Sequence, residues 1–109
     1  MPQASYVQHG DSVDYKPAVD TPAGAVVVVG DLVGVTKRDI QANIFGAIAV
    51  EGVFDIDKET AEVFSAGAKV YWDSATNQAT TEEAGNKLLG KAVHAAVANN
   101  NKVRVRLSQ

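Results

Sequence analysis

The stretch Ala25-Val26-Val27-Val28-Val29-Gly30-Asp31-Leu32-Val33-Gly34-Val35 decides the fold class. Its first five residues are an uninterrupted apolar run, rich in the β-branched valine that packs well on a pleated sheet. Gly30-Asp31 follows at once, and both residue types suit a turn. The apolar run then resumes at Leu32. Two short strands separated by a turn are therefore predicted over residues 25–35.

The rest of the chain repeats this texture. Short runs rich in valine, isoleucine and aromatic residues are separated by Gly, Asn and Asp, and they cover residues 12–16, 47–50, 53–54, 69–72, 88–97 and 102–107. Runs of this kind bounded by turn formers are typical of strands. We therefore predict a mostly β fold, a compact β-barrel or sandwich of seven to eight short strands.

One segment departs from the strand pattern and predicts a short helix over about residues 57–66. Asp57 can cap the first turn of this helix. Glu59 lies in that turn, where the helix dipole favours the negative charge of its carboxylate. Gly67 suits the left-handed residue just past a helix end. Ala61 and Phe64 are three residues apart and would share one face, so we expect this helix to seal one open end of the barrel.

Length and composition indicate a small globular protein. The chain has 109 residues, of which 46% are hydrophobic and 21% charged. We expect an N-terminal arm at 1–10, polar apart from Tyr6 and Val7, and a single β-rich domain at 11–109.

No apolar run approaches the roughly 18 residues of a membrane span. The first five residues lack the basic and apolar parts of a signal peptide, so we expect neither a membrane segment nor a leader.

The sequence shows little that could carry catalysis. It contains no cysteine, which excludes disulfides, thiolate metal sites and a cysteine nucleophile. Neither the phosphate-binding pattern GxxxxGK[ST] nor the dinucleotide pattern GxGxxG occurs. His9 lies in the arm and His94 in a predicted strand, and no serine sits in a Gly-x-Ser-x-Gly elbow. We predict that the protein is not an enzyme and takes no cofactor and no small-molecule substrate.

Three carboxylates, Asp55, Asp57 and Glu59, are spaced two residues apart, as in the first half of a calcium loop. The loop glycine and the distal glutamate of such a loop are missing. We therefore interpret these residues as a helix cap with an acidic first turn, and we predict no metal site.

Lys102, Arg104 and Arg106 alternate with apolar residues up to Leu107, so the period of two places the three cations on one face of a strand. Two interpretations stay open: a solvated outer face, or a cationic stripe that meets an acidic partner surface. A formal charge of -3 and the lack of interleaved aromatic residues argue against nucleic acid.

Two apolar spots could anchor a protein partner. Tyr71 and Trp72 are adjacent in a predicted strand, so one should fill the core while the other faces out. The sequence does not decide which, and we keep Trp72 among the candidate interface residues. Ile44-Phe45 forms an apolar pair in a predicted turn, where an exposed apolar patch favours an interaction site.

A set of short motifs covers nearly the whole chain in a fixed order: Tyr6–Asp11, Gly30–Val35, Glu51–Lys58, Ala66–Asp73, Leu89–Ala92 and Val103–Leu107. In order and spacing this set resembles the DUF2190 family of phage capsid cement proteins. The chain departs from the family at Ala42–Phe45, where members often have a Gly-Glu pair, and at His94, where they often have glycine.

The resemblance implies a small β-rich decoration protein on the outer surface of a tailed-phage capsid, made in the bacterial host cytoplasm. Such proteins are usually homotrimers, although a dimer in solution stays open, and they clamp neighbouring major capsid protein subunits. Nucleic acid and membranes are not among the expected partners. The expected contact residues are Tyr6 and Val7 in the arm, Ile44, Phe45, Trp72, Lys102, Arg104 and Arg106. The alternative is a carbohydrate- or cell-surface-binding β module, which needs exposed aromatic residues around a shallow groove.

Overall fold

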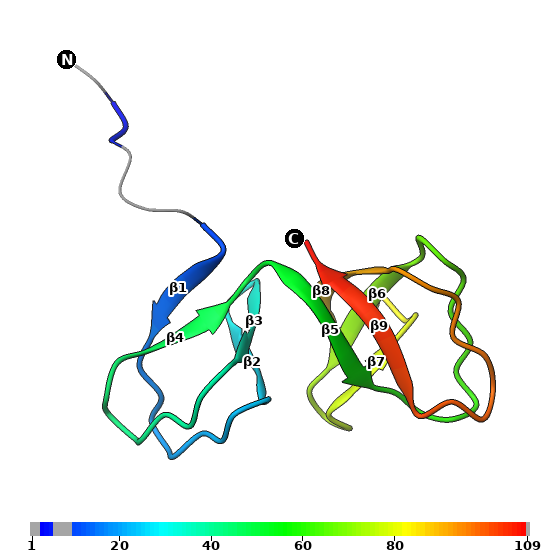
Figure 1. Ribbon diagram of the computed structural model, residues 1–109, viewed down its shortest axis with the longest axis horizontal. Coiled ribbons are helices and arrows are strands. Elements are labelled where there is room, and N and C mark those ends of the chain that lie inside the picture. The colour runs from blue at the N-terminus through cyan, green and yellow to red at the C-terminus, as the bar shows by residue number, and fades with distance from the viewer. Residues whose placement is uncertain (1–2, 6–9, 109) are drawn as a thin grey trace.

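A computed structural model describes residues 3–5 and 10–108, and within them nine strands form two antiparallel sheets (Figure 1). Tyr6 and Val7 of the expected arm lie outside the described residues. The strands are β1 (Ser12–Tyr15), β2 (Val26–Val29), β3 (Leu32–Thr36), β4 (Gly46–Ala49), β5 (Gly52–Asp57), β6 (Lys69–Asp73), β7 (Gln78–Thr80), β8 (Lys87–Ala92) and β9 (Lys102–Leu107).

The first sheet has the strand order β1-β4-β3-β2 and contains the valine run that opened the sequence analysis. β2 and β3 pair antiparallel with Val29 opposite Leu32, so only two residues form the turn between them. Gly30 adopts a φ of 61° in this turn, a left-handed conformation in which a side chain is disfavoured. The two strands predicted over residues 25–35 are confirmed.

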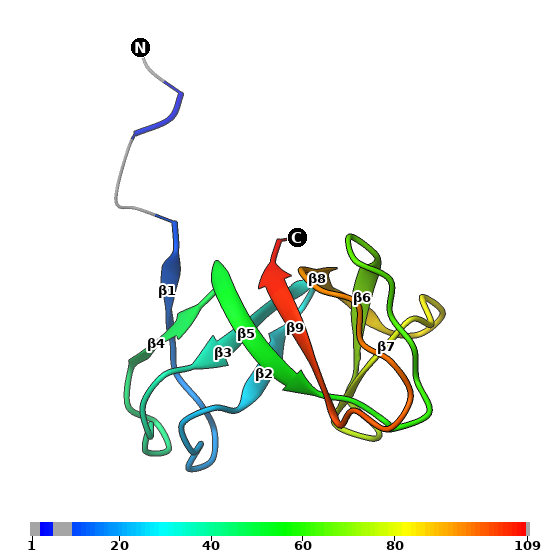
Figure 2. The ribbon, with the colours of Figure 1, turned by 45° about the vertical axis from the view of Figure 1, so that its right-hand side comes forward.

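The second sheet has the order β5-β9-β8-β6-β7. β5 and β9 pair along their whole length, from Gly52 opposite Leu107 to Asp57 opposite Lys102, and they run side by side in Figure 2. β8 lies unusually close to β9, because a Cβ atom added at Gly90 would come 2.0 Å from the Arg106 carbonyl oxygen. Only glycine permits this close approach of the two backbones.

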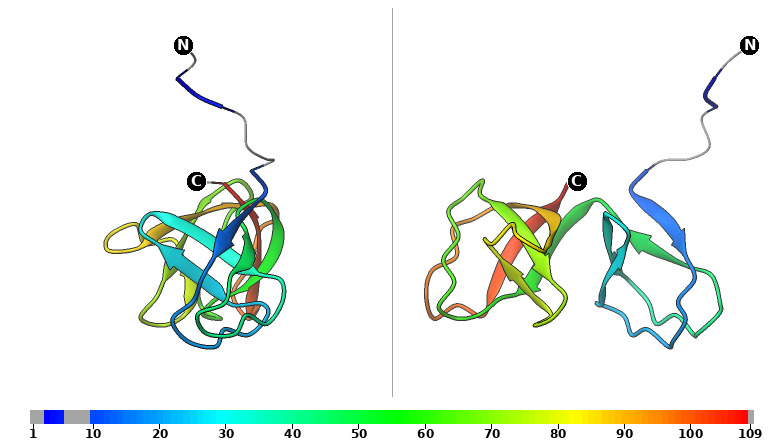
Figure 3. Two further views of the ribbon diagram at one scale, coloured as in Figure 1. Left: turned by 90° about the vertical axis from the view of Figure 1, so that its left-hand side faces the viewer. Right: turned by 180° about the vertical axis from the view of Figure 1, so that it is seen from behind.

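Hydrophobic side chains from both sheets meet in one core. The two sheets lie side by side, as the view from behind in Figure 3 shows. Val33 and Val35 of β3 belong to the same buried cluster as Phe64, Leu89 and Val105 from the second half of the chain. The alternation of β9 follows from this packing, because its three apolar residues point inward and its three cations point to solvent.

The predicted barrel or sandwich is wrong, because the chain forms two separate open sheets. β1 and β2 are the unpaired edges of the first sheet. The edges of the second sheet are β5 and β7, and in the described residues they are joined by one isolated bridge, between Ala79 of β7 and Lys58 just past the end of β5. The second sheet is therefore strongly curled without closing into a barrel.

The predicted helix at 57–66 is also wrong, since no helix forms in the described residues. β5 continues through Asp57, and Lys58 is then buried with 3% of its surface exposed. The Lys58 ammonium lies within 2.6–3.4 Å of the carbonyl oxygens of Glu59, Thr60, Glu62 and Val97. Carbonyls that converge on one ammonium cannot all point along a helix axis, so the segment forms a loop.

The same loop is pinned on its far side. Phe64 exchanges backbone hydrogen bonds of 2.8 and 2.9 Å with Ala96. The Glu62 carboxylate accepts hydrogen bonds from the backbone N–H and the hydroxyl of Thr81, at 2.9 and 2.7 Å. These bonds replace the helical ones that the cap pattern predicted.

In the described part of the chain there is no helix long and apolar enough to cross a membrane.

Candidate protein-binding surfaces

The outer face of β5 and β9 carries a ladder of ion pairs that the sequence did not predict. Lys102 lies opposite Asp57 and donates a short hydrogen bond to its carboxylate. Arg104 lies opposite Asp55 and donates from Nε at 2.9 Å and from a terminal nitrogen at 3.3 Å. The hydrogen bond from Arg104 lowers the pKa of Asp55 and in turn raises the pKa of the guanidinium. Two of the three predicted cations are thus already balanced within the chain.

Arg106, the third predicted cation, differs from the other two. It lies opposite Val53, an exposed apolar residue, and has no ion pair with any other described residue. On its other side, Arg106 lies opposite Lys91 of β8. Lys91 lies opposite Lys69 of β6. The unbalanced charge therefore runs across the sheet rather than along β9.

Lys69 and Lys91 were missed by sequence reasoning. Each alternates with apolar neighbours, so its outward direction could have been inferred from the period of two. Their position beside Arg106 depends on the pairing of β6, β8 and β9, which a single sequence does not specify.

The Ile44-Phe45 pair is exposed, as expected for an apolar interaction site. The side chains are 55% and 70% exposed, and Lys16 places its ammonium 5.3 Å from the centre of the Phe45 ring. The pair lines a groove of about 630 Å³ together with the Lys37–Gln41 segment. The groove has both apolar lining residues, such as Ile40, and charged ones, Lys37, Arg38 and Asp39, which suits a protein segment that carries both apolar and charged side chains.

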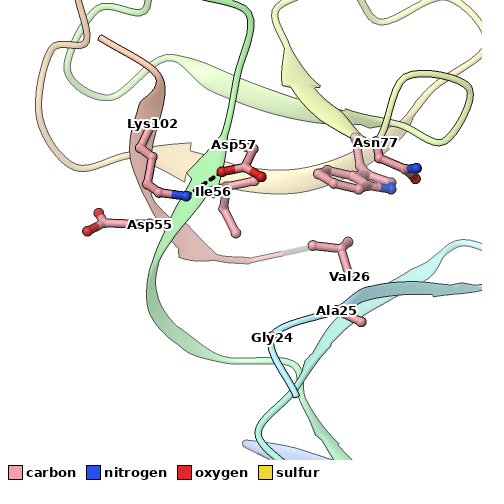
Figure 4. A pocket seen from close by; sticks show the side chains of 9 residues that line it. Gly24, Ala25, Val26, Asp55, Ile56, Asp57, Asn77 and Lys102 are labelled. Atoms are coloured by element: carbon pink, nitrogen blue, oxygen red, sulfur yellow. Dashed lines mark hydrogen bonds and ion pairs between the residues drawn. The ribbon is translucent and has the colours of Figure 1, made fainter. Parts of the chain in front are cut away.

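A second groove, of about 370 Å³, lies between the two sheets (Figure 4). Val26 of β2 and the two residues before it, Gly24 and Ala25, line one side of it. Asp55–Asp57 of β5, Lys102 of β9 and Asn77, just before β7, line it from the second half of the chain. Trp72 also lines this groove but is only 7% exposed, because it belongs to the core. Tyr71 is half-buried, so of the two adjacent aromatic residues it is Trp72 that fills the core. The carbohydrate-binding alternative needs an exposed aromatic platform, and Trp72 does not offer one here.

The remaining sequence candidates lie elsewhere. His94 is exposed in a bend after β8 and not in the predicted strand, since β8 ends at Ala92. Asp55 and Asp57 are held by the ion-pair ladder, and no group of three potential metal ligands occurs in residues 3–5 and 10–108. The arm residues Tyr6 and Val7 are outside the described residues.

A family model described as phage cement protein matches residues 7–107 of the 109-residue chain, from the expected arm to the end of β9. No curated protein and no solved structure matches.

Proposed function

The chain belongs to the phage cement protein family, and from this premise we propose that it binds major capsid protein on the outer surface of a tailed-phage capsid and stabilises the contacts between neighbouring subunits. The family is a structural, non-enzymatic kind of protein that forms part of the virion capsid. The match over residues 7–107 is the observation that carries the proposal.

The proposed mechanism is mass action. A protein that binds only the assembled shell stabilises it by RT ln(1 + [L]/Kd) at each site, about 2.7 kcal/mol at a hundredfold excess over Kd. Many equivalent sites on one shell multiply this effect. A homotrimer bound where several capsid subunits meet would engage them simultaneously, so its three weak contacts combine into a tight attachment.

The Ile44-Phe45 pair is the apolar part of the proposed contact. Large exposed apolar side chains beside a groove are typical of protein interfaces, and aromatic residues supply much of the binding energy there. The arm around Tyr6 and Val7 is proposed to order on the shell as a second contact. Trp72, at 7% exposure, is left out of the proposed contact.

Co-sedimentation with expanded capsids tests the proposal. The protein should sediment together with the capsids, and it should remain in the supernatant when the capsids are omitted. Removal of residues 1–9 should weaken binding while the circular dichroism spectrum keeps its β signal. Failure of the full-length protein to bind expanded capsids contradicts the proposed function, and unchanged binding of the truncated protein removes the arm from it.

A matched pair of substitutions tests the apolar contact. Phe45→Ser should weaken capsid binding about 10- to 100-fold, because burial of one large apolar side chain contributes roughly 1.5–3 kcal/mol. Val63→Ser is the control, since Val63 is 57% exposed and lies in a loop of the other half of the chain. Equal loss of binding in both variants contradicts a specific role for Phe45.

A further inference from the structure

Lys69, Lys91 and Arg106 form a line of like charges across three neighbouring strands, which we call the cationic row. Arg106 of β9 is directly opposite Lys91 of β8, and Lys91 is directly opposite Lys69 of β6. Directly opposite residues of antiparallel strands point to the same side of the sheet, and all three side chains are exposed. Strands are about 4.8 Å apart, so the row spans roughly 10 Å.

The cationic row works against the stability of the isolated protein. Like charges directly opposite each other in adjacent strands are destabilising. The same sheet face uses the opposite arrangement one step further along β9, where Arg104 and Lys102 pair with Asp55 and Asp57. None of the three cations of the row has an ion pair with another described residue. The fold therefore balances two cations of this face and leaves three unbalanced.

We propose that the cationic row binds a cluster of carboxylates on the capsid subunit, which balances these charges only in the bound state. This inference rests on the proposed function. Of the three cations that the sequence indicated, it keeps Arg106 in the polar contact, and it replaces Lys102 and Arg104 with Lys69 and Lys91. The exposed Val53, opposite Arg106, extends the row with an apolar side chain, which favours a protein surface as the partner.

A compact group of carboxylates fits this surface better than an extended polyanion. The whole chain carries a formal charge of -3, so a long nucleic acid that extends past the row would meet a molecule with more acidic than basic groups. A protein patch of similar size meets the row alone, because exposed charges are largely screened beyond about 8 Å at physiological salt. The row also lacks the interleaved aromatic side chains on which single-stranded bases stack.

The closing experiment compares Lys91→Gln and Arg106→Gln with Lys102→Gln. Each variant removes one cation from the same face of the sheet, but only Lys102 has an internal carboxylate partner. The first two should keep or raise the thermal midpoint of the free protein, and each should weaken capsid binding about threefold. Lys102→Gln should lower the midpoint and leave capsid binding nearly unchanged.

The triple reversal Lys69→Glu, Lys91→Glu and Arg106→Glu should weaken capsid binding more than tenfold, and wild-type binding should fall as salt rises. Capsid binding that survives the triple reversal overturns the inference but leaves the proposed function standing. A lower midpoint in Lys91→Gln and Arg106→Gln would also overturn it, since the row would then serve the fold.

A titration without capsids keeps the two proposals distinguishable. Backbone amide NMR shifts should change at residues 69, 91 and 106 when a hexaglutamate peptide is added at low salt, even if the protein fails to bind capsids. No change at these residues, equal or tighter binding of a six-nucleotide DNA strand, or self-association that the triple reversal abolishes would each overturn the assignment to a capsid carboxylate cluster.

Discussion

Lys58 shows how one residue redirects a segment whose local signals favour a helix. Three of the carbonyl oxygens around its ammonium also accept a backbone hydrogen bond: those of Glu59, Thr60 and Val97. The Glu62 carbonyl, at 2.6 Å, is the closest of the four to the ammonium. A charged donor that is buried among carbonyls forms strong hydrogen bonds, and these outweigh the modest contribution of a helix cap.

Replacement of Lys58 by methionine tests this account at the residue scale. Methionine keeps the apolar stem but removes the donor, so converging carbonyl dipoles stay buried without the charge that balances them. We expect the free energy of unfolding to fall by about 2–4 kcal/mol, measured by urea denaturation. Lys37→Met, at an exposed position, is the control and should change stability by less than about 0.5 kcal/mol. Equal stability of the two variants contradicts the role given to the Lys58 ammonium.

At the scale of single elements, the strands could be predicted because their residues carry local signals. The valine run with its Gly30-Asp31 turn and the alternation in 102–107 both led to strands that the structure contains. The segment after β5 could not be predicted, because two of the contacts that hold it have partners about 30–40 residues away: Val97 for the Lys58 ammonium and Ala96 for the Phe64 backbone. The candidate site was limited in the same way. The exposure of Arg106 can be predicted from the alternation of β9. That Lys91 and Lys69 lie beside it can be known only from the pairing of the strands.

The acidic anchors of β5 and of the following loop predict a pH dependence. Hydrogen bonds from Arg104 lower the pKa of Asp55 from its ordinary 3.8, and those from Thr81 lower the pKa of Glu62 from 4.5. In the unfolded chain both groups take up protons at higher pH than in the folded protein. Their stabilisation is therefore complete above the ordinary values and is lost as the pH falls through the lowered ones.

We therefore expect the free energy of unfolding to decrease between about pH 5 and pH 3, and the double variant Asp55→Asn, Glu62→Gln to show a flatter profile. The variant should be less stable than the wild type at pH 7 and should approach it at pH 3. The effect of Asp55 is reduced by solvent, because its side chain is 46% exposed. Glu59→Gln, at an exposed position of the same loop as Glu62, is the control. Parallel profiles for the wild type and the double variant would contradict this assignment.

At the scale of the whole molecule, the first sheet depends on the second for much of its core. Val33 and Val35 are buried in the cluster that the second sheet dominates, with Val26 and Val28 packed against it. The buried residues of the first sheet outside this cluster are few, chiefly Ile48 and its neighbours. A four-stranded sheet with so small a separate core gains most of its stability from contact with a second layer.

This dependence predicts that both sheets unfold together. Val33→Ala should lower the free energy of unfolding by about 2–3 kcal/mol, because it leaves a cavity where the two sheets meet. If the first sheet folded independently, this local defect would make it unfold before the second sheet, in a separate transition. With a shared core, both sheets should still unfold in one transition. Denaturation followed by Trp72 fluorescence, which reports on the second sheet, should coincide with amide NMR signals of β2 and β3 in the wild type and in the variant. Two separated transitions in the wild type would show that each sheet folds by itself. A single transition also bears on the proposed role, because a clamp transmits force between capsid subunits only if its two halves yield together.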